Sequence, residues 1–483
     1  MLPLNQQPAY DFEGFRKIHL MGIGGAGMSG LALLLGEMGY EVSGCDVAHS
    51  YYIEKVNSKG VQFRMGHSRE HLDEFHPDAL VCSSAIPSGN AEILYARETG
   101  VPVFKRAEVL SWLFNRRIGI GISGTHGKTT TASMVGLIFE HAGLEPTVAI
   151  GGELCDIGGN AKLGKGRHMI AELDESDGSF ELFNSHIAVV TNADWDHVDY
   201  YPSLRSVLDA YGRFLDNRIG EGKAILCGED KGLANLLEKG ISGDIITYGW
   251  GSAWDWGAHE VVHKSGGGVT FKVLHQGREA GSLALQVSGD HNVLNALAAC
   301  AVASSYSIPF NTIAEALKTF RGAKRRLQHM GRISNIDFFD DYGHHPKEVS
   351  ATLTALRKMF PDRRLMAVFQ PHRFTRTAAM YREFADVLTL ADEIFLMPIY
   401  PADEMPIEGI DSNLIGDLVN QRGNRTFQLC SGSDDVVAKI CHFIQDGDVV
   451  TTIGAGDVFM VGEKVIQRLQ KTGLPNNAVA LET

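Results

Sequence analysis

The sequence predicts an α/β protein of three domains built on mainly parallel sheets. Its 483 residues correspond to about three domains of ordinary size. A strand-like run, a glycine-rich turn and a helical stretch follow one another repeatedly, which is typical of doubly wound sheets. Apolar residues make up 44% of the chain and charged residues 21%, so a disordered or collagen-like protein is excluded.

The expected strands are apolar throughout, as strands buried on both faces are. Three of them lead into glycine-rich turns, at residues 17–21, 117–122 and 449–453. Further runs of this kind cover residues 79–82, 187–191 and 365–369. Residues 244–290 differ, because glycine and β-branched residues replace helix formers there. We expect that segment to form an antiparallel insertion or sheet edge in the middle domain.

Charge and cysteine usage narrow the class of protein. The net charge of −14 argues against a domain that wraps nucleic acid. Seven scattered cysteines without a CxxC pair predict reduced thiols in a cytoplasmic protein, not a disulfide framework or a zinc site. No signal peptide and no run of about 18 apolar residues is present, so we expect no membrane insertion.

The first glycine loop follows the first strand. Gly22, Gly24 and Gly27 match GxGxxG, whose bare backbone amides can hold a diphosphate at a helix start. Asp46 follows the next strand-like run, where an acid can bind a ribose hydroxyl. The pattern fits NAD, FAD and a UDP-sugar about equally, and a glycine turn needed only for packing is the structural alternative.

The second glycine loop is more specific. Gly124-Thr-His-Gly-Lys128-Thr129-Thr130 follows a strand and supplies backbone amides, a lysine for the β- and γ-phosphates and a hydroxyl for Mg²⁺. The generic phosphate loop has glycine where this chain has Ile122. We therefore expect a phosphate loop of a non-standard class.

Two acidic segments and two basic segments also follow predicted strands. Residues 171–177 and 191–199 carry carboxylates and His197, a set that can hold a second Mg²⁺ but also suits a solvated face. Residues 340–346 and 370–376 are rich in histidine and arginine. Arginines at two strand ends favour a small anionic ligand.

Taken together, these segments resemble the Mur ligase family over nearly the whole chain, from Ile18 to about Gly462. The most discriminating pair is DDYGHHP with FQPHRFTRT. The supporting segments include HLMGIGGAGMSGLA, ISGTHGKTTT, AELDESDGSF, TNADWDHVDYYPS, GDHNVLNALAA and TTIGAGD. Several family members carry a carbamylated lysine after the Asp-His pair. Here no lysine lies between His197 and Lys223. The alanine-adding member of the family is the one that lacks this lysine, so the resemblance points to that branch.

The resemblance implies three domains with distinct tasks. These are a Rossmann-like UDP-substrate domain (1–106), a central ATP-binding domain of the phosphate-loop type (107–321) and a Rossmann-like amino-acid domain (322–483). It further implies a reaction in which ATP phosphorylates the lactyl carboxylate of UDP-N-acetylmuramate. The amine of L-alanine then attacks this acyl phosphate, and ADP and phosphate leave.

The resemblance also assigns the site residues. For the UDP-substrate it implies Gly22, Gly24, Gly25, Gly27, Asp46, Ser83, Ser84 and Arg106. For ATP it implies Gly124, Thr125, His126, Gly127, Lys128, Thr129, Thr130, His291, Asn292, Asn295, Arg325, Arg326 and Asp340. For L-alanine it implies Tyr342, His344, Arg373 and Arg376. Two Mg²⁺ ions are implied, one on Thr129 and a second held by Glu172 and His197 together. The implied catalytic set is Lys128, Thr129, Glu172, His197 and His344.

Rival functions remain open at this stage. Within the ligases, the runner-up is the recycling enzyme that attaches a tripeptide to the same UDP-sugar, although its first loop lacks the GIGGAGMSG run. An NAD-dependent dehydrogenase explains GxGxxG and Asp46 but not the second loop. A phosphate-loop motor or kinase leaves the first domain without a role. The expected assembly is a monomer or homodimer in the cytoplasm.

Overall fold

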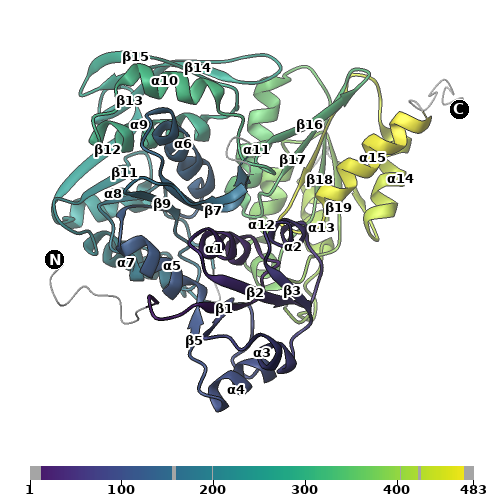
Figure 1. Cartoon of the computed structure of the whole chain (residues 1–483). Helices are drawn as coiled ribbons and strands as arrows, with labels where there is room; N and C mark the ends of the chain where they lie inside the picture. The colour runs from purple at the N-terminus through teal and green to yellow at the C-terminus, as the bar shows by residue number, and fades with distance from the viewer. Residues whose placement is uncertain (1–11, 155–158, 198–199, 403, 423–425, 473–483) are drawn as a thin grey trace, which may run out of the picture.

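A computed structural model describes residues 12–154, 159–197, 200–402, 404–422 and 426–472, and these form three α/β units (Figure 1). Cys155 and Asp199 lie outside the described residues. The strands of the three sheets lie within residues 17–105, 118–285 and 328–453, and the expected boundaries at 106/107 and 321/322 fall between these ranges. No helix in the described part of the chain combines the length and apolarity needed to cross a bilayer.

The first unit is a parallel five-stranded sheet in the order β3-β2-β1-β4-β5. Its chain order reverses at β1, so the ends of β1, β2 and β4 meet at one edge, where ligands bind in doubly wound folds. The strands are β1 (Lys17–Met21), β2 (Glu41–Asp46), β3 (Gln62–Met65), β4 (Ala79–Cys82) and β5 (Val103–Lys105). The helices are α1 (Ala26–Glu37), α2 (Tyr51–Asn57), α3 (Glu70–Phe75), α4 (Ala91–Glu98) and α5 (Arg106–Asn115).

The middle unit holds a ten-stranded sheet in the order β15-β14-β13-β12-β11-β10-β6-β9-β7-β8. Its strands are β6 (Ile118–Ser123), β7 (Thr147–Leu154), β8 (Gly159–Lys162), β9 (His168–Glu172), β10 (Ile187–Val190), β11 (Lys223–Cys227), β12 (Asp244–Trp250), β13 (Trp256–His263), β14 (Val269–His275) and β15 (Arg278–Leu285). Its helices are α6 (Lys128–His141), a short 3-10 helix (Ser179–Leu182), α7 (Leu204–Asp216), α8 (Lys231–Lys239), α9 (Asp290–Ser305) and α10 (Phe310–Thr319).

The expected antiparallel segment is present at one edge of this sheet, but it starts later than the sequence suggests. β12 pairs in parallel with β11 and with β13. The antiparallel pairs are β13 with β14 and β14 with β15. β7 and β8 form another antiparallel pair at the opposite edge. The strands from β13 through β12, β11, β10, β6 and β9 to β7 are therefore parallel, and antiparallel pairs extend the sheet at both edges.

The third unit is a six-stranded sheet in the order β16-β17-β21-β18-β19-β20, parallel except for β16. Its strands are β16 (Gln328–Ile333), β17 (Ile336–Asp341), β18 (Leu365–Phe369), β19 (Glu393–Leu396), β20 (Thr426–Leu429) and β21 (Val449–Ile453). Its helices are α11 (Pro346–Met359), α12 (Phe374–Leu388), α13 (Asn413–Gln421), α14 (Ser433–Phe443) and α15 (Phe459–Thr472).

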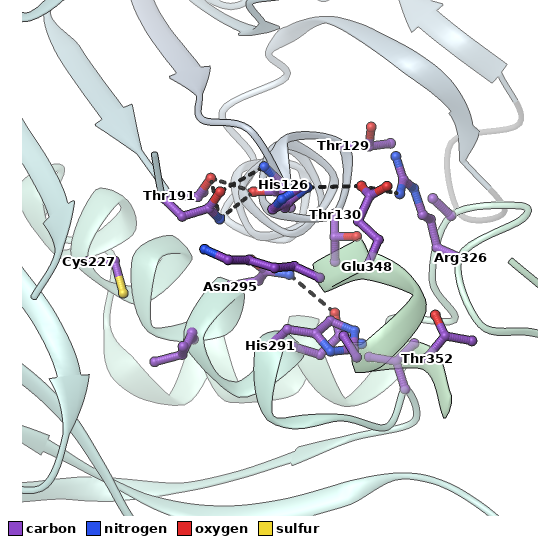
Figure 2. Close-up of a pocket in the computed structure, with 18 of the residues that line it drawn as sticks. His126, Thr129, Thr130, Thr191, Cys227, His291, Asn295, Arg326, Glu348 and Thr352 are labelled. Carbon is purple, nitrogen blue, oxygen red and sulfur yellow. Dashed lines mark hydrogen bonds and ion pairs between the residues drawn. The ribbon is translucent and has the colours of Figure 1, made fainter. Parts of the chain in front are cut away.

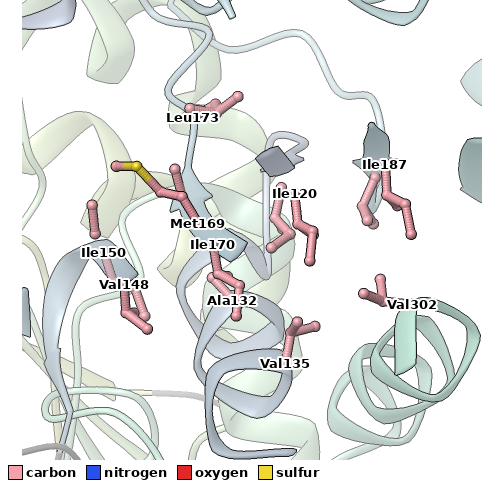
Figure 3. Packing of buried hydrophobic residues seen from close by; sticks show 14 of the residues in the cluster. Ile120, Ala132, Val135, Val148, Ile150, Met169, Ile170, Leu173, Ile187 and Val302 are labelled. Carbon is pink, nitrogen blue, oxygen red and sulfur yellow. The ribbon is translucent and has the colours of Figure 1, made fainter. Parts of the chain in front are cut away.

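The cores show how the units are joined. One continuous apolar cluster runs from Phe12 to Ala323 and so includes both the first and middle units. Figure 3 shows its centre, where Ile120 and Ile170 on neighbouring strands pack over Val135 of α6, with Val302 of α9 alongside. The third unit buries two separate clusters, one on each face of its sheet. It is therefore a body with its own core, docked against the other two.

Candidate active site

The first glycine loop sits where β1, β2 and β4 end. Gly22 has a φ of 80°, and a Cβ there would lie 3.0 Å from Ser83. A Cβ on Gly27 would lie 3.2 Å from the Arg106 guanidinium. Asp46 accepts a 2.8 Å hydrogen bond from the Gly24 amide. The structure thus brings the predicted glycines, serine, arginine and aspartate together, and Asp46 holds the loop itself in this state.

The second glycine loop connects the central strand β6 to α6. Gly124 and Gly127 have φ values of 126° and 83°, which disfavour any side chain. Thr191 and Asn192, at the end of the neighbouring strand β10, fix the loop from outside. Thr191 Oγ1 donates to the His126 carbonyl at 2.5 Å, and the His126 amide donates to Asn192 Oδ1 at 2.8 Å. The loop is therefore held rigid before any ligand binds.

Lys128 at the start of α6 is almost fully enclosed. Its Nζ donates to Gly124 O at 2.7 Å and to Glu175 Oε2 at 2.8 Å. Burial opposes the charge, but the carboxylates led by Glu175 outweigh it and raise the pKa of Lys128 above its usual range. The lysine is therefore a permanent cation aimed at the loop, suited to a phosphate.

The predicted metal ligands fall into two groups. Thr129 Oγ1 donates to Glu172 Oε1 at 2.8 Å, and Glu172 Oε2 also accepts the Gly151 amide at 2.6 Å. His197 belongs elsewhere, because Asp174, Glu175 and His197 each offer one ligand atom within 4.8 Å of the others. Carboxylates, a hydroxyl and one imidazole suit Mg²⁺, which needs only one or two protein ligands. Among the described residues, Glu172 is not part of this three-residue group.

A pocket of about 300 Å³ opens beside the second loop, between the middle and third units (Figure 2). Its middle-domain wall includes Gly127, Thr129 and Thr130 of the loop and His291, Asn292 and Asn295 of α9. Burial lowers the pKa of His291 to about 4, so its ring is neutral. Its apolar surface comes from side chains such as Val287, Leu294, Phe320 and Ala323. This combination suits a purine base next to a polyphosphate.

The third unit closes the other side of this pocket. Arg326, Asp341, Lys347 and Glu348 line it. Burial raises the pKa of the Asp341 carboxyl to about 6. The structure separates two predicted ATP residues from this wall, because Arg325 Nε donates to Asp340 Oδ2 at 3.0 Å and Arg325 Nη2 donates to Gly454 O at 2.6 Å. Arg326 is the arginine that faces the pocket.

His126 connects the loop to the third unit. Its Nε2 lies 3.1 Å from Asp194 Oδ2. Its Nδ1 lies 3.2 Å from Glu348 Oε1, and Figure 2 shows this contact. Burial opposes protonation, but the charges of Glu348 and Asp194 raise the pKa of His126 to about 9. Lys347 forms an ion pair with Asp194 across the same boundary. At neutral pH a cationic His126 therefore bridges two carboxylates from different domains.

The predicted amino-acid residues cluster at the ends of β17 and β18. The rings of His344 and His372 lie 5.6 Å apart, and His344 is 5.5 Å from Tyr342. Burial lowers the pKa of His344 to about 3 and that of His372 to about 4. Both rings are therefore neutral at physiological pH, and each can donate one hydrogen bond and accept another.

The two predicted arginines differ in accessibility. Arg376 donates from Nη2 to Asp196 Oδ1 at 2.8 Å, and its side chain is 6% exposed. Burial opposes ionisation of Asp196, but Arg376 and His197 lower its pKa well below the usual range. Arg373 lies 3.6 Å from Glu404 and its side chain is 38% exposed. Arg373 is therefore the arginine more open to a solute.

The sequence does not identify Lys347 and Glu348 as site residues, and it indicates Glu175 only as one carboxylate of the acidic segment 171–177. Glu348 is the N3 residue of α11, where its carboxylate accepts the amides of His344 and His345 at 2.9 Å and 3.2 Å. A glutamate three residues after the N-cap is a recognisable capping-box signal. Nothing in the local sequence shows that the same carboxylate reaches His126, 222 positions earlier in the chain.

Three α/β units around a phosphate loop, with a third unit completing the pocket, define a multidomain nucleotide-dependent enzyme. Residues 17–118, 122–303 and 325–456 match, in order, the Mur ligase catalytic domain, the Mur ligase middle domain and the glutamate ligase domain of Mur ligases. The chain belongs to the Mur ligase family.

Two curated relatives within this family carry the same name. The UDP-N-acetylmuramate–L-alanine ligase of Geobacter sulfurreducens is 41% identical over 456 residues, which cover 94% of this chain and 98% of that protein. The enzyme of the same name from Lawsonia intracellularis is 43% identical, covering 93% and 98%.

Solved structures agree with this placement. UDP-N-acetylmuramate-alanine ligase MurC from Thermotoga maritima has a TM-score of 0.79 and 29% identity, covering 95% of this chain and 99% of that one. A murein peptide ligase from Psychrobacter arcticus has a TM-score of 0.70 and 25% identity, covering 96% of this chain and 100% of that one.

Proposed function

We propose that this chain joins L-alanine to UDP-N-acetylmuramate with ATP, releasing ADP and phosphate in peptidoglycan precursor synthesis. The observation that carries the proposal is one pocket lined both by residues of the second glycine loop (His126, Gly127, Thr129 and Thr130) and by the third-domain arginine Arg326. Lys128 Nζ is held against the same loop by the Gly124 carbonyl. Full-length relatives named for this reaction support it. The three tasks divide over residues 1–106, 107–321 and 322–483.

ATP occupies the pocket between the middle and third units. Its base lies against His291, Asn292 and Asn295, and its phosphates lie on the amides of residues 124–130. Lys128 neutralises charge that develops on the transferred phosphoryl group. Because Glu175 holds Lys128 Nζ at 2.8 Å, the lysine enters the reaction charged and already oriented. From the third unit, Arg326 adds a second cation.

Mg²⁺ fits the side chains present. Thr129 and Glu172 suit one ion, and Asp174, Glu175 and His197 suit a second. When bound, Mg²⁺ withdraws charge from the phosphate and carboxylate oxygens. The Gly151 amide donates to Glu172 Oε2 at 2.6 Å, so the carboxylate is already oriented before an ion binds.

The UDP part binds at the ends of β1, β2 and β4, on Gly22, Gly24, Gly25 and Gly27 with Ser83, Ser84 and Arg106. Close approach of Arg106 to Gly27 places a guanidinium beside the bare amides, which suits a diphosphate. Asp46 remains the proposed partner of the ribose, and it exchanges its bond from the Gly24 amide for one from the substrate.

L-Alanine binds at the third unit. Arg373 takes its carboxylate, while Tyr342 and His344 face its amine. The neutral His344 ring can accept a hydrogen bond from the amine and orient its lone pair at the acyl carbon. Attack forms the new C–N bond, phosphate leaves with the C–O bond electrons, and the amine proton passes to solvent or phosphate. Arg376 positions Asp196 beside His197.

The runner-up is the addition of a whole tripeptide to the same UDP-sugar. The likeness to the Psychrobacter arcticus murein peptide ligase favours it. The deciding experiment measures phosphate release from Mg²⁺-ATP and UDP-N-acetylmuramate with L-alanine, with the tripeptide or with neither. Release that requires L-alanine, with the alanyl product identified by mass, supports the proposal. Release with the tripeptide alone assigns the recycling activity, and release without UDP-N-acetylmuramate removes the ligase proposal.

We place the enzyme in the cytoplasm, where its ATP is available, as a monomer or homodimer. Equilibrium sedimentation of the full chain, with and without UDP-N-acetylmuramate, decides between the two assemblies. A larger oligomer overturns this assignment.

A further inference from the structure

The first unit buries a group of metal-binding side chains that the proposed ligase reaction does not use. His19 lies on β1, Cys45 on β2, His71 on α3 and Glu92 on α4. Their exposed fractions are 1%, 0%, 9% and 0%. We call them the His–Cys–Glu cluster. It lies on the sheet face covered by α3 and α4, among Met21, Leu72 and Ile93.

The facing atoms of this cluster converge on one point. His19 Nε2 lies 3.0 Å from Glu92 Oε1, and His71 Nδ1 lies 3.4 Å from the same oxygen. Cys45 Sγ lies 3.4 Å from Glu92 Oε2. One ligand atom from each of the four residues lies within 4.8 Å of all the others. Ligands about 2.0–2.3 Å from a tetrahedral Zn²⁺ are separated by about 3.3–3.8 Å, so the spacing suits such an ion after small adjustments.

The cluster is also oriented from outside, as metal ligands are. Ser43 Oγ lies 2.7 Å from His19 Nδ1 and so turns Nε2 inward. The Ser68 amide donates to Glu92 Oε2 at 3.1 Å. Inside the cluster, His19 Nε2 and His71 Nδ1 both face Glu92 Oε1. An outer hydrogen bond that fixes an imidazole ring so that its other nitrogen faces a shared point is typical of metal sites.

We propose that His19, Cys45, His71 and Glu92 bind one Zn²⁺-class transition-metal ion, separate from the Mg²⁺ of the reaction. Two neutral imidazoles, one thiolate and one carboxylate balance the two charges of the ion, so the filled site is neutral and suits burial. Binding displaces the thiol proton of Cys45 to solvent. Sulfur and nitrogen ligands select Zn²⁺ or Co²⁺ over Mg²⁺.

The ion would tie four elements together beneath the first glycine loop. The Cys45 carbonyl accepts the amides of Gly22 at 2.8 Å and Ile23 at 3.1 Å. A metal on Cys45 therefore holds the strand end that carries this loop. The alternative is that the four residues bind no metal and form a buried polar network in which His19, Cys45 and His71 contact Glu92. The experiment must distinguish this network from a metal site.

The test uses the full-length protein after dialysis against a chelator, with excess Mg²⁺ present to occupy carboxylate sites. Zn²⁺ is titrated in competition with a chromophoric chelator, and Co²⁺ is titrated in parallel while thiolate-to-metal absorption is recorded. We expect one equivalent of each metal and a thiolate band with Co²⁺. Zn²⁺ should also raise the melting temperature, because it binds the folded state.

Variants identify the ligands. Cys45→Ser should abolish the Co²⁺–thiolate band and weaken Zn²⁺ binding by at least about 100-fold. Cys430→Ser, which changes another buried cysteine in the third unit, should leave both unchanged. Should Cys45→Ser fail to fold, His71→Asn carries the test, with the exposed His49→Asn as its control. Absence of stoichiometric binding in the wild type, or binding unchanged in His71→Asn, overturns the proposal in favour of the ion-pair network.

Discussion

His126 Nδ1 lies 3.2 Å from Glu348 Oε1, and this pair joins the phosphate loop of the middle domain to the first turn of α11 in the third domain. Glu348 at the same time accepts the amides of His344 and His345. One carboxylate therefore caps a helix, orients the segment proposed to meet the amino acid and contacts the ATP loop. The state of the nucleotide loop and that of the third domain are linked through it.

The first prediction concerns the pH dependence of this link. The pKa of His126 is raised to about 9 in the folded protein, above the ordinary value of 6.5. A raised pKa contributes stability that is fully present below pH 6.5 and is lost as the pH rises through about 9. We expect the stability difference between wild type and His126→Gln, measured by denaturant unfolding, to shrink between pH 7 and about pH 10.

The control is His141→Gln, which changes the last residue of α6, away from the pocket. Its stability difference from wild type should not follow this pH profile. A constant difference for His126→Gln over the whole range would mean that the ring is uncharged at neutral pH.

The second prediction concerns Lys128. Lys128→Ala removes the cation that Glu175 and the Gly124 carbonyl hold at the loop. We expect turnover to fall at least about 10²–10³-fold, the scale for losing one preorganised group that stabilises developing charge. Phosphate release measures this, and circular dichroism confirms the fold. Lys165→Ala, at an exposed lysine, is the matched control, and activity retained in Lys128→Ala contradicts the loop assignment.

The third prediction separates the two arginines. Arg373→Ala should raise the KM for L-alanine by about tens to thousands of fold, with little change in the KM for UDP-N-acetylmuramate. The reason is that losing one partner of a charge pair that is desolvated on binding costs about 2–5 kcal/mol. Initial rates at varied concentrations of each substrate measure this. Equal changes in both KM values would show that Arg373 does not bind the amino acid.

Arg376 should behave differently. Its removal leaves the buried Asp196 unpaired, so Arg376→Met should lower the free energy of unfolding by about 3–5 kcal/mol. The second change Asp196→Asn should restore part of this loss, since no buried charge then remains. Chemical denaturation of the two single variants and the double variant measures the coupling. Independent, additive losses would mean that the 2.8 Å pair contributes little.

The fourth prediction concerns the divalent ions. Glu172 bonds with Thr129, whereas His197 gathers with Asp174 and Glu175. If these are two sites, Glu172→Gln and His197→Ala each raise the Mg²⁺ concentration needed for half-maximal rate, and the two free-energy changes add in the double variant. If one ion contacts both residues, the double variant is scarcely worse than the single ones. Activity titrations with Mg²⁺ distinguish the two cases.

The sequence predicted the strand-turn-helix units because their signals are local. The apolar runs at 79–82, 187–191 and 365–369 are confirmed as β4, β10 and β18, apart from the last residue of the second. The second glycine loop and the two acidic segments follow β6, β9 and β10, which are adjacent parallel strands. The carboxyl ends of such strands meet at one edge of the sheet, where ligands bind in this kind of fold. The antiparallel segment was placed too early, since β12 carries the same β-branched composition as its neighbours but pairs in parallel.

Side-chain partners across domains could not be predicted. The pairs His126–Glu348, Lys347–Asp194 and Arg376–Asp196 depend on how the third unit docks, and no periodicity encodes that. The His–Cys–Glu cluster was missed for a similar reason. Spacing rules for zinc look for paired cysteines, whereas this cluster takes single residues from four elements.

The third unit has its own apolar cores, and its contacts with the middle unit include ion pairs. This arrangement has a consequence for how ATP is used. A domain interface held by ion pairs separates at a modest cost in free energy, whereas an apolar interface of similar area is harder to separate. Arg326, Lys347 and Glu348 line the pocket from the third unit, so separating the two units removes them from the pocket proposed to hold ATP. We therefore expect ATP hydrolysis in the absence of the other substrates to be slow, because the proposed site is complete only in the domain arrangement that also gathers the proposed amino-acid residues.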